Sequence, residues 1–224
     1  MSGFVISVNL GSEEPNQAKK VGVTGIRKRP TDLATLRSPG PKRGGLGSGL
    51  VGDFVGDTRH HGGDRQAAYA FAREELDAWE RRLDLVIPNG SFGENVTTRG
   101  LDVDASLIGD RWAVGDEVVL EVTGPRIPCA TFAARMGIRG WLKRFSAVGR
   151  SGAYLSVLSG GQVLAGDQVR VVSRAQHDVD VPTTFRAFMG DLDAAEHVLA
   201  IGCLPEWELA PLRQMVERRP SKGA

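Results

Sequence analysis

The chain has 224 residues, with 28 basic and 27 acidic side chains and a formal net charge of +1. This balance excludes the strong overall field that draws a protein onto nucleic acid or an anionic membrane, so any anion site must be local. With only two cysteines, no recognisable signal peptide and no apolar run of the ~18 residues that cross a bilayer, we expect a cytoplasmic protein with reduced thiols that binds neither nucleic acid nor membrane.

Short apolar runs, separated by Gly, Asp and Pro, dominate the chain up to about residue 175. Runs of this kind are typical of strands, and many short strands with such turns predict a β-barrel. One amphipathic helix, 73–83, interrupts them and should cover one side or mouth of the barrel. The predicted strands are 4–8, 21–26, 67–71, 118–123, 154–158 and 169–173.

The pattern becomes helical after the barrel segment, which we assign to a domain of residues 1–176. Three helices are predicted, over 183–189, over 191–200 with Asp191 as N-cap, and over 205–218, where Pro211 should bend or split the pattern. They form a small extension, 180–220. Because no basic patch marks a second helix, we disfavour DNA recognition and expect a docking or dimerisation unit, with a homodimer left open.

Cys129 has an unusual setting in the stretch PRIPCATF, residues 125–132. Prolines restrict the backbone before it, Arg126 brings a fixed positive charge, and residues 130–136 have helical spacing. A thiol at a helix N-terminus beside an arginine is favoured in the thiolate form, which acts as nucleophile or metal ligand. Cys203 lies in an apolar run without such neighbours and reads as a packing residue. Cys129 is therefore the candidate catalytic residue.

Two other stretches offer polar groups that suit an anion or a polar ligand. RHHGGDRQAAYAF, 59–71, places donors around a Gly-Gly pair, and GSFGENVTTRG, 90–100, is dense in amide and hydroxyl groups. A solvated turn and a plain polar loop are the alternatives. A zinc site is disfavoured, because no second Cys or His stands at ligand spacing. The donors of the first stretch are Arg59, His60, His61 and Arg65, and the polar groups of the second are those of Asn95, Thr97, Thr98 and Arg99.

A series of motifs keeps its order and spacing over residues 3–174. They are VTGIRKRP (23–30), GLVGD (49–53), HGG with AAYAF (61–71), Trp79, FGENVTTRGL (92–101), IGDRWAVGD (108–116) and PRIPC (125–129). Together they resemble the MOSC domain family, named for the C-terminal domain of molybdenum cofactor sulfurases, and within it the stand-alone bacterial branch known as YiiM-like. The helical tail resembles the three-helix extension of the same branch.

The resemblance implies a mainly β fold with helices, of the α+β class, in which a MOSC-type barrel holds the molybdenum cofactor (molybdopterin). It implies that Cys129 is bonded through sulfur to molybdenum, since a thiolate is a soft, anionic ligand. It also implies contacts between Lys28 or Arg126 and the anionic end of the cofactor. The remaining polar shell that it implies consists of His61, Arg65, Asn95 and Thr97.

Relatives in this superfamily reduce N-hydroxylated compounds such as hydroxylaminopurines and amidoximes. The resemblance therefore implies an oxidoreductase whose substrate is a small N-hydroxylated molecule. Since the sequence shows no flavin, haem or iron–sulfur motif, the electrons must come from a separate electron-donor protein. Pyridoxal phosphate, which full sulfurases bind in a further domain, is not expected in a chain of this length.

Two features depart from the family pattern. Relatives commonly read HGGPDKAVYAY where this chain reads HGGDRQAAYAF, so Gln66 replaces a lysine. Arg65 cannot simply take its place, because neighbouring residues on a β run point to opposite faces. The glycine-rich segment 38–49 is longer than usual, and we expect a weakly ordered loop that could lie over the site as a lid.

Three functions agree with these residues, and we favour the first. It is a molybdenum-dependent reductase, in which the metal donates two electrons to the N-hydroxylated substrate. The second is a sulfur carrier with a persulfide on Cys129, which predicts sulfane sulfur and no metal. The third is a non-catalytic carrier that protects molybdopterin and shows no turnover.

Overall fold

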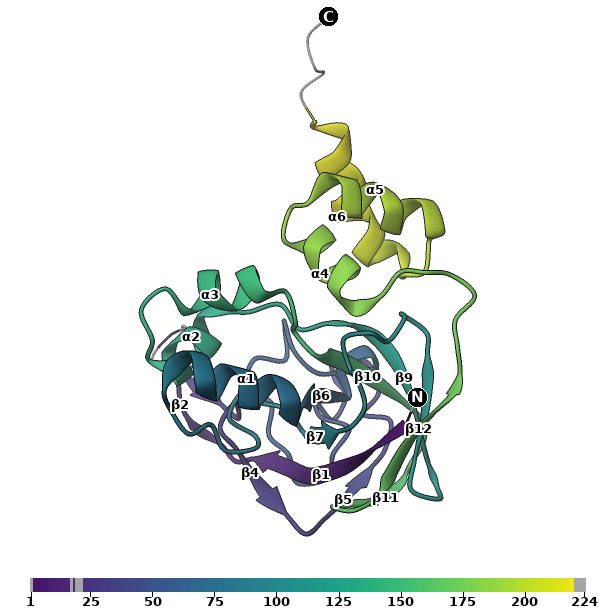
Figure 1. Cartoon of the computed structure of the whole chain (residues 1–224). Helices are drawn as coiled ribbons and strands as arrows, with labels where there is room; N and C mark the ends of the chain where they lie inside the picture. The colour runs from purple at the N-terminus through teal and green to yellow at the C-terminus, as the bar shows by residue number, and fades with distance from the viewer. Residues whose placement is uncertain (1, 17, 19–21, 220–224) are drawn as a thin grey trace, which may run out of the picture.

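The computed structural model describes residues 2–16, 18 and 22–219, and its main body is a closed β-barrel (Figure 1). Seven of the described strands form the ring, because the last of them pairs back with the first, and all neighbours are antiparallel except β6 and β7. In ring order they are β1 (Ser2–Gly11), β7 (Val96–Arg99), β6 (Ala68–Ala72), β10 (Ala153–Ser159), β9 (Val118–Pro125), β8 (Arg111–Val114) and β12 (Gln168–Ser173). The predicted α+β barrel is confirmed.

Large apolar side chains fill the barrel. Trp112, Leu120 and Leu155 come from three neighbouring strands and are at most 1 % exposed. Val5 and Val169 close the same core from β1 and β12, the two strands whose pairing closes the ring. Burying a side chain of this size stabilises the folded state by about 1.5–3 kcal/mol. Since a slip by one residue would turn these side chains to the other face and lose that energy, their alternation along the strands fixes the register.

Five of the described strands lie outside the ring. β4 (Lys28–Thr31) extends it by pairing with β1. The other pairs are β2 (Glu14–Pro15) with β3 (Val23–Thr24), and β5 (Leu33–Leu36) with β11 (Gly161–Leu164). The predicted strand 21–26 is thus reduced to β3, and residue 21 lies outside the described residues.

A second, aromatic core joins three helices to one side of the barrel. The helices are α1 (Arg73–Leu83), α2 (Ala130–Met136) and α3 (Trp141–Val148). The predictions of α1 and α2 are confirmed, whereas α3 was not predicted. Phe132 of α2 is 0 % exposed, and its ring centroid lies 5.3 Å from that of Trp141 and 5.2 Å from that of Phe92. These contacts fix the position of α2 and of Cys129 at its N-terminus.

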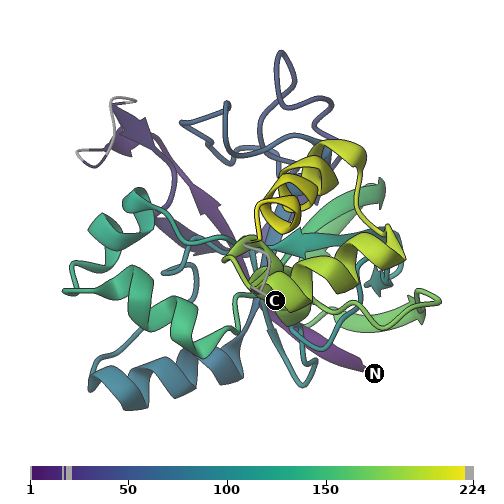
Figure 2. The same ribbon diagram turned by 90° about the horizontal axis from the view of Figure 1, so that it is seen from above.

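The C-terminal helices lie above the barrel in Figure 1, and the view from above shows them over its strands, to one side of α1–α3 (Figure 2). They are α4 (Val181–Phe188), α5 (Leu192–Ile201) and α6 (Glu206–Glu217). The predicted cap is confirmed, since the Asp191 carboxylate accepts a hydrogen bond from Ala194 N at 3.1 Å. Of the two predicted effects of Pro211, the split is wrong, because α6 continues through it, and the bend stays a prediction. None of the described helices is long and apolar enough to cross a membrane.

The glycine-rich segment 38–49 forms neither helix nor strand, as predicted, but hydrogen bonds tie it to the turn after His61. Gly63 N donates to Gly47 O at 2.8 Å, and Asp64 N donates to Gly40 O at 2.9 Å. A Cβ atom on Gly62 would lie 2.5 Å from Gly47 O. The Gly-Gly pair therefore permits the close approach of the chain's own loop, while the mobility of that loop and its role as a lid stay predictions.

Asp104 should make the free energy of unfolding depend on pH. The side chain is 0 % exposed, and its Oδ2 atom has no hydrogen-bond partner within the described residues. Burial raises its pKa from 3.8 to about 6, although Arg150 opposes the shift. The folded protein then holds this proton more tightly than the unfolded chain. The contribution of Asp104 to the free energy of unfolding is therefore fully present below pH ~4, decreases as the pH rises, and is lost above pH ~6. A shift of about two units corresponds to ~3 kcal/mol.

We expect Asp104→Asn to remove this dependence, because the amide oxygen can still accept from Ser151 N and Gly152 N, as Oδ1 of Asp104 does. Urea unfolding at pH 4.5 and 7.5 measures the effect. From pH 4.5 to pH 7.5, the free energy of unfolding of the wild type should fall by roughly 2 kcal/mol more than that of the variant. Asp102→Asn is the matched control, since Asp102 also binds Arg150 but is exposed. Equal pH dependence in wild type and Asp104→Asn would contradict this assignment.

Candidate functional site

Residues from distant parts of the chain enclose a pocket of about 100 Å³ beside the barrel. Of the residues predicted from the sequence, it brings together Lys28, His61, Asn95, Arg126 and Cys129. Arg65 and Thr97 do not line it. The polar groups that sequence reasoning did not assign to the site include Asp53, Tyr69 and Tyr154.

Cys129 stands at the rim of this pocket as the N-cap residue of α2. Its backbone is extended, with φ −132° and ψ 170°, and its carbonyl accepts the first helical hydrogen bond from Ala133 N at 3.0 Å. The side chain is half-buried and forms no disulfide. No group of three His, Cys, Asp or Glu side chains suited to a metal occurs within the described residues. The thiol is thus held in place by the helix and is open to the pocket.

Arg126 is a buried cation without an acceptor. Its side chain lies between two rings, with the guanidinium carbon 5.0 Å from the Tyr69 centroid and 4.6 Å from the Phe132 centroid. The residue is 6 % exposed, and neither an ion pair nor a hydrogen bond to its guanidinium is found within the described residues. Burial lowers its pKa, but Tyr154, Tyr69 and Cys129 outweigh that effect and raise it. A buried charge is normally paired, so this site suits an anionic ligand.

Lys28 carries the second positive charge, but Asp53 neutralises it. Lys28 Nζ lies 2.5 Å from Asp53 Oδ1, and the two side chains are 7 % and 1 % exposed. Burial lowers the pKa of Lys28, and the Asp53 carboxylate opposes this shift. Asp53 also accepts hydrogen bonds from Gly11 N at 2.7 Å, Ser48 Oγ at 2.7 Å and Asn95 Nδ2 at 3.0 Å. Asp53 therefore organises the pocket floor, and the motif GLVGD was the signal for it.

Asn95 and Thr97 belong to the internal support of the pocket. The Asn95 side chain donates to Asp53 and accepts from Tyr69 N at 3.2 Å, so its polar atoms are engaged inside the protein. Thr97 is 0 % exposed and donates to Glu94 Oε1 at 3.2 Å. The buried Glu94 carboxylate, whose pKa burial raises, also accepts from two backbone amides of its own loop. These side chains shape the pocket, and only Asn95 borders it.

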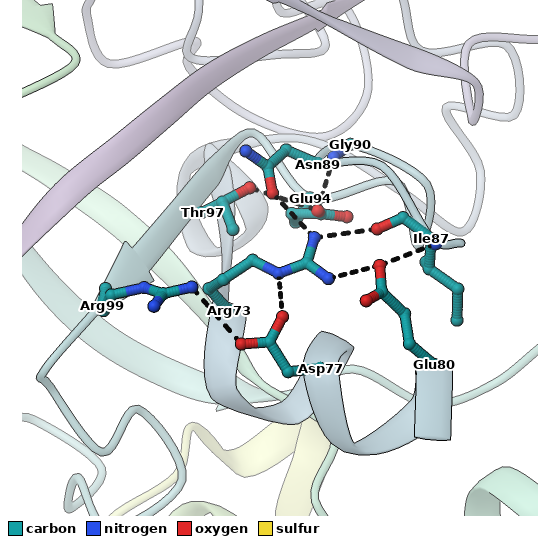
Figure 3. Close-up of polar contacts among 9 residues, drawn as sticks. All are labelled: Arg73, Asp77, Glu80, Ile87, Asn89, Gly90, Glu94, Thr97 and Arg99. Atoms are coloured by element: carbon teal, nitrogen blue, oxygen red, sulfur yellow. Dashed lines mark hydrogen bonds and ion pairs between the residues drawn. The ribbon is translucent and has the colours of Figure 1, made fainter. Parts of the chain in front are cut away.

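Arg73 holds the loop that carries Gly93 and Glu94 against α1 (Figure 3). Its Nη1 atom donates to Ile87 O at 2.8 Å and to Asn89 Oδ1 at 3.1 Å, while Nη2 donates to Glu80 Oε1 at 2.6 Å. Gly93 lines the pocket with φ 83°, and a Cβ atom there would lie 3.3 Å from Arg126 Nη1. The loop thus brings bare backbone close to the buried guanidinium, and a side chain would fill that space.

The turn that follows His61 contributes the amide of Gln66 to the pocket. Residues Asp64–Gln66 form the short 3-10 helix η1, not a strand. Gln66 lines the pocket, and its Oε1 atom is buried without a hydrogen-bond partner within the described residues. Arg65 points away, donating to Thr123 O at 2.7 Å and pairing with Glu208 at 3.2 Å. Arg65 therefore brings no positive charge into the pocket in place of Gln66. This was expected from the alternation of a strand, but the structure shows that Arg65 lies in η1, which directs its side chain toward Glu208.

The pocket beside the closed barrel combines a half-buried thiol with a buried arginine that has no ion-pair partner within the described residues. Comparison with known proteins gives the family. The family model described as "MOSC domain" matches residues 57–170. The chain belongs to the MOSC domain family, and its resemblance to this family and to the YiiM-like branch is confirmed.

Three relatives illustrate the similarity. The chain is 31 % identical to "Uncharacterized protein YflK" of Bacillus subtilis over 207 residues, which cover 90 % of this chain and 89 % of YflK. It is 31 % identical over 131 residues to a "Reductase" of Gibberella moniliformis, covering 57 % of this chain and 23 % of that protein. The crystal structure of YiiM from Geobacillus stearothermophilus superposes with a TM-score of 0.74 at 22 % identity, covering 96 % of this chain and 99 % of YiiM.

Proposed function

We propose that this MOSC protein binds the molybdenum cofactor in the pocket, with Cys129 as a metal ligand, and reduces N-hydroxylated compounds in the cytoplasm. The observation that carries the proposal is the buried guanidinium of Arg126, which has no acceptor within the described residues and lies at the same pocket as Cys129. A soft thiolate suits molybdenum, and a buried guanidinium without an ion-pair partner suits an anionic group of the cofactor.

The residues of the pocket have separate tasks in this proposal. Arg126 donates hydrogen bonds to an anionic oxygen, and the ammonium of Lys28, which is already paired with Asp53, offers a further N–H donor to the ligand. Gln66 offers an unpaired amide oxygen, which accepts a hydrogen bond where a lysine would donate one. Burial raises the pKa of Tyr154, so its hydroxyl keeps its proton at neutral pH and is a donor at the pocket.

The reaction consumes electrons and protons in equal number. An N-hydroxylated compound R–NHOH takes up two electrons and two protons, its N–O bond breaks, and R–NH₂ and water leave. The cofactor, when bound, supplies the electron pair. A separate electron-donor protein restores that pair, and the similarity to a protein named "Reductase" supports this class of reaction.

A sulfur carrier is the second candidate, and the exposure of Cys129 favours it. The thiol is half-buried and borders a second groove as well as the pocket, so an acceptor can approach the sulfur from that side. An acceptor thiolate would attack the outer sulfur of a Cys129 persulfide, the S–S bond would break, and the Cys129 thiolate would leave while the acceptor carries the new persulfide. A carrier that only holds molybdopterin would use the same pocket without turnover.

One preparation separates these functions. The full chain is made in a host that synthesises the cofactor, and molybdenum, pterin and sulfane sulfur are measured together with reduction of benzamidoxime by reduced methyl viologen. The proposal expects stoichiometric molybdenum and pterin with turnover. Sulfane sulfur without metal would identify the sulfur carrier, and bound cofactor without turnover would identify the non-catalytic carrier.

A further inference from the structure

A second groove, of about 430 Å³, lies between the barrel and the C-terminal helices. Its inner wall is the end of β9 and the segment that leads to Cys129, and its outer wall is Phe188 of α4 with Trp207 and Glu208 of α6. The groove shares four residues with the first pocket, so the two spaces meet. The shared residues are His61, Gln66, Cys129 and Tyr154.

An ion pair fixes the outer wall of the groove. Arg65 Nε lies 3.2 Å from Glu208 Oε1, and Arg65 Nη2 donates to Thr123 O of β9 at 2.7 Å. One guanidinium thus joins α6 to the barrel. The two side chains are 32 % and 16 % exposed and neutralise each other, and Lys42 of the same groove adds an ammonium that interacts with Glu208.

Trp207 stands next to this ion pair and is open to the groove. The chain has four tryptophans. Trp79, Trp112 and Trp141 are at most 2 % exposed, whereas Trp207 is 59 % exposed. Ile127, Pro128 and Phe188 face the same space, and its volume lies in the range of ligand pockets, about 300–1,000 Å³. The lining also includes His60, His61 and Gln66, and Lys42 Nζ lies 5.9 Å from the centroid of the Trp207 ring. The exposed part of the indole offers a flat surface for an aromatic ring.

We propose that Trp207 is a substrate-binding residue that sets specificity, and this rests on the proposed function. The groove holds the ring of an N-hydroxylated compound against the indole, while the N–O end reaches the place where groove and pocket meet, at Cys129. The C-terminal extension is then a wall of the active site. This is a different role from the docking or dimerisation that its sequence suggested.

Two compounds with the same reacting group test the proposal, namely benzamidoxime, which carries a ring, and acetamidoxime, which carries a methyl group. We expect Trp207→Ala to raise the KM for benzamidoxime by about 10-fold. Its KM for acetamidoxime, both kcat values and the molybdenum content should not change. Trp207→Phe keeps a ring and should restore most of the affinity. Ile201→Ala is the matched control, because Ile201 is exposed on the same extension and does not line the groove.

Fluorescence gives a readout that does not depend on turnover. Since the other three tryptophans are buried, the difference between wild type and Trp207→Phe isolates the emission of Trp207. Benzamidoxime should quench this difference signal, and acetamidoxime should not. Quenching by benzamidoxime in a protein without molybdenum or turnover would keep the role of Trp207 and reject the proposed function. Turnover with no quenching and equal KM changes for both compounds would reject Trp207 and keep the proposed function.

Discussion

Cys129→Ser is expected to purify without molybdenum and without reductase activity while it keeps its fold. Serine is a preferred N-cap residue, so α2 should begin at the same place. Its hydroxyl is neutral and hard, whereas molybdenum favours a soft, anionic thiolate. Removal of an outer-shell partner already costs about 10–100-fold in metal affinity, so loss of the ligand should cost at least that much. Elemental analysis and circular dichroism measure the two effects.

Cys203→Ser is the matched control, because the second thiol is also half-buried but lines neither the pocket nor the groove. It should keep its molybdenum and its activity. Equal molybdenum in wild type and Cys129→Ser would rule out the thiolate as a ligand. If that variant lost sulfane sulfur while wild type contained no molybdenum, the sulfur carrier would be the better description.

The barrel could be predicted because its strands alternate apolar and polar residues or are apolar throughout. β7 was missed, since Thr97 and Thr98 are both buried although the stretch reads as a polar loop. α3 was missed because it begins after Gly140, which has φ 72° and no capping side chain. Both elements depend on tertiary contacts, which local patterns do not contain.

The site was predictable to the extent that its residues lie near one another in a motif. PRIPC gave Cys129 and Arg126, which line one pocket. The pairing of Arg65 with Glu208 spans 143 residues and has no local signal, so Arg65 was assigned to the cofactor shell. Whether any of these residues contacts the cofactor stays a prediction, and Arg126 is the one that can be tested most cleanly.

Arg126→Met should lose the cofactor and at the same time stabilise the protein that lacks it. Methionine has a similar length and can lie between Tyr69 and Phe132, but it carries no charge. A buried charge without a partner destabilises the folded state, and replacing buried charges by apolar groups often stabilises a protein by about 1–4 kcal/mol. Pterin content and urea unfolding of the cofactor-free protein measure the two effects. Arg126→Lys, which keeps the charge, should retain part of the cofactor.

The contrast with Lys28 decides whether Arg126 serves the ligand or the fold. Lys28→Met leaves the Asp53 carboxylate buried and unpaired, and breaking such a pair costs about 3–5 kcal/mol, so this variant should lose stability as well as cofactor. The double change Lys28→Met with Asp53→Asn should recover stability but not the cofactor. If Arg126→Met were destabilised like Lys28→Met, or kept its pterin, the guanidinium would support the aromatic core and the anion site would lie elsewhere. A gain in stability with loss of pterin is the result that only a ligand-binding cation predicts.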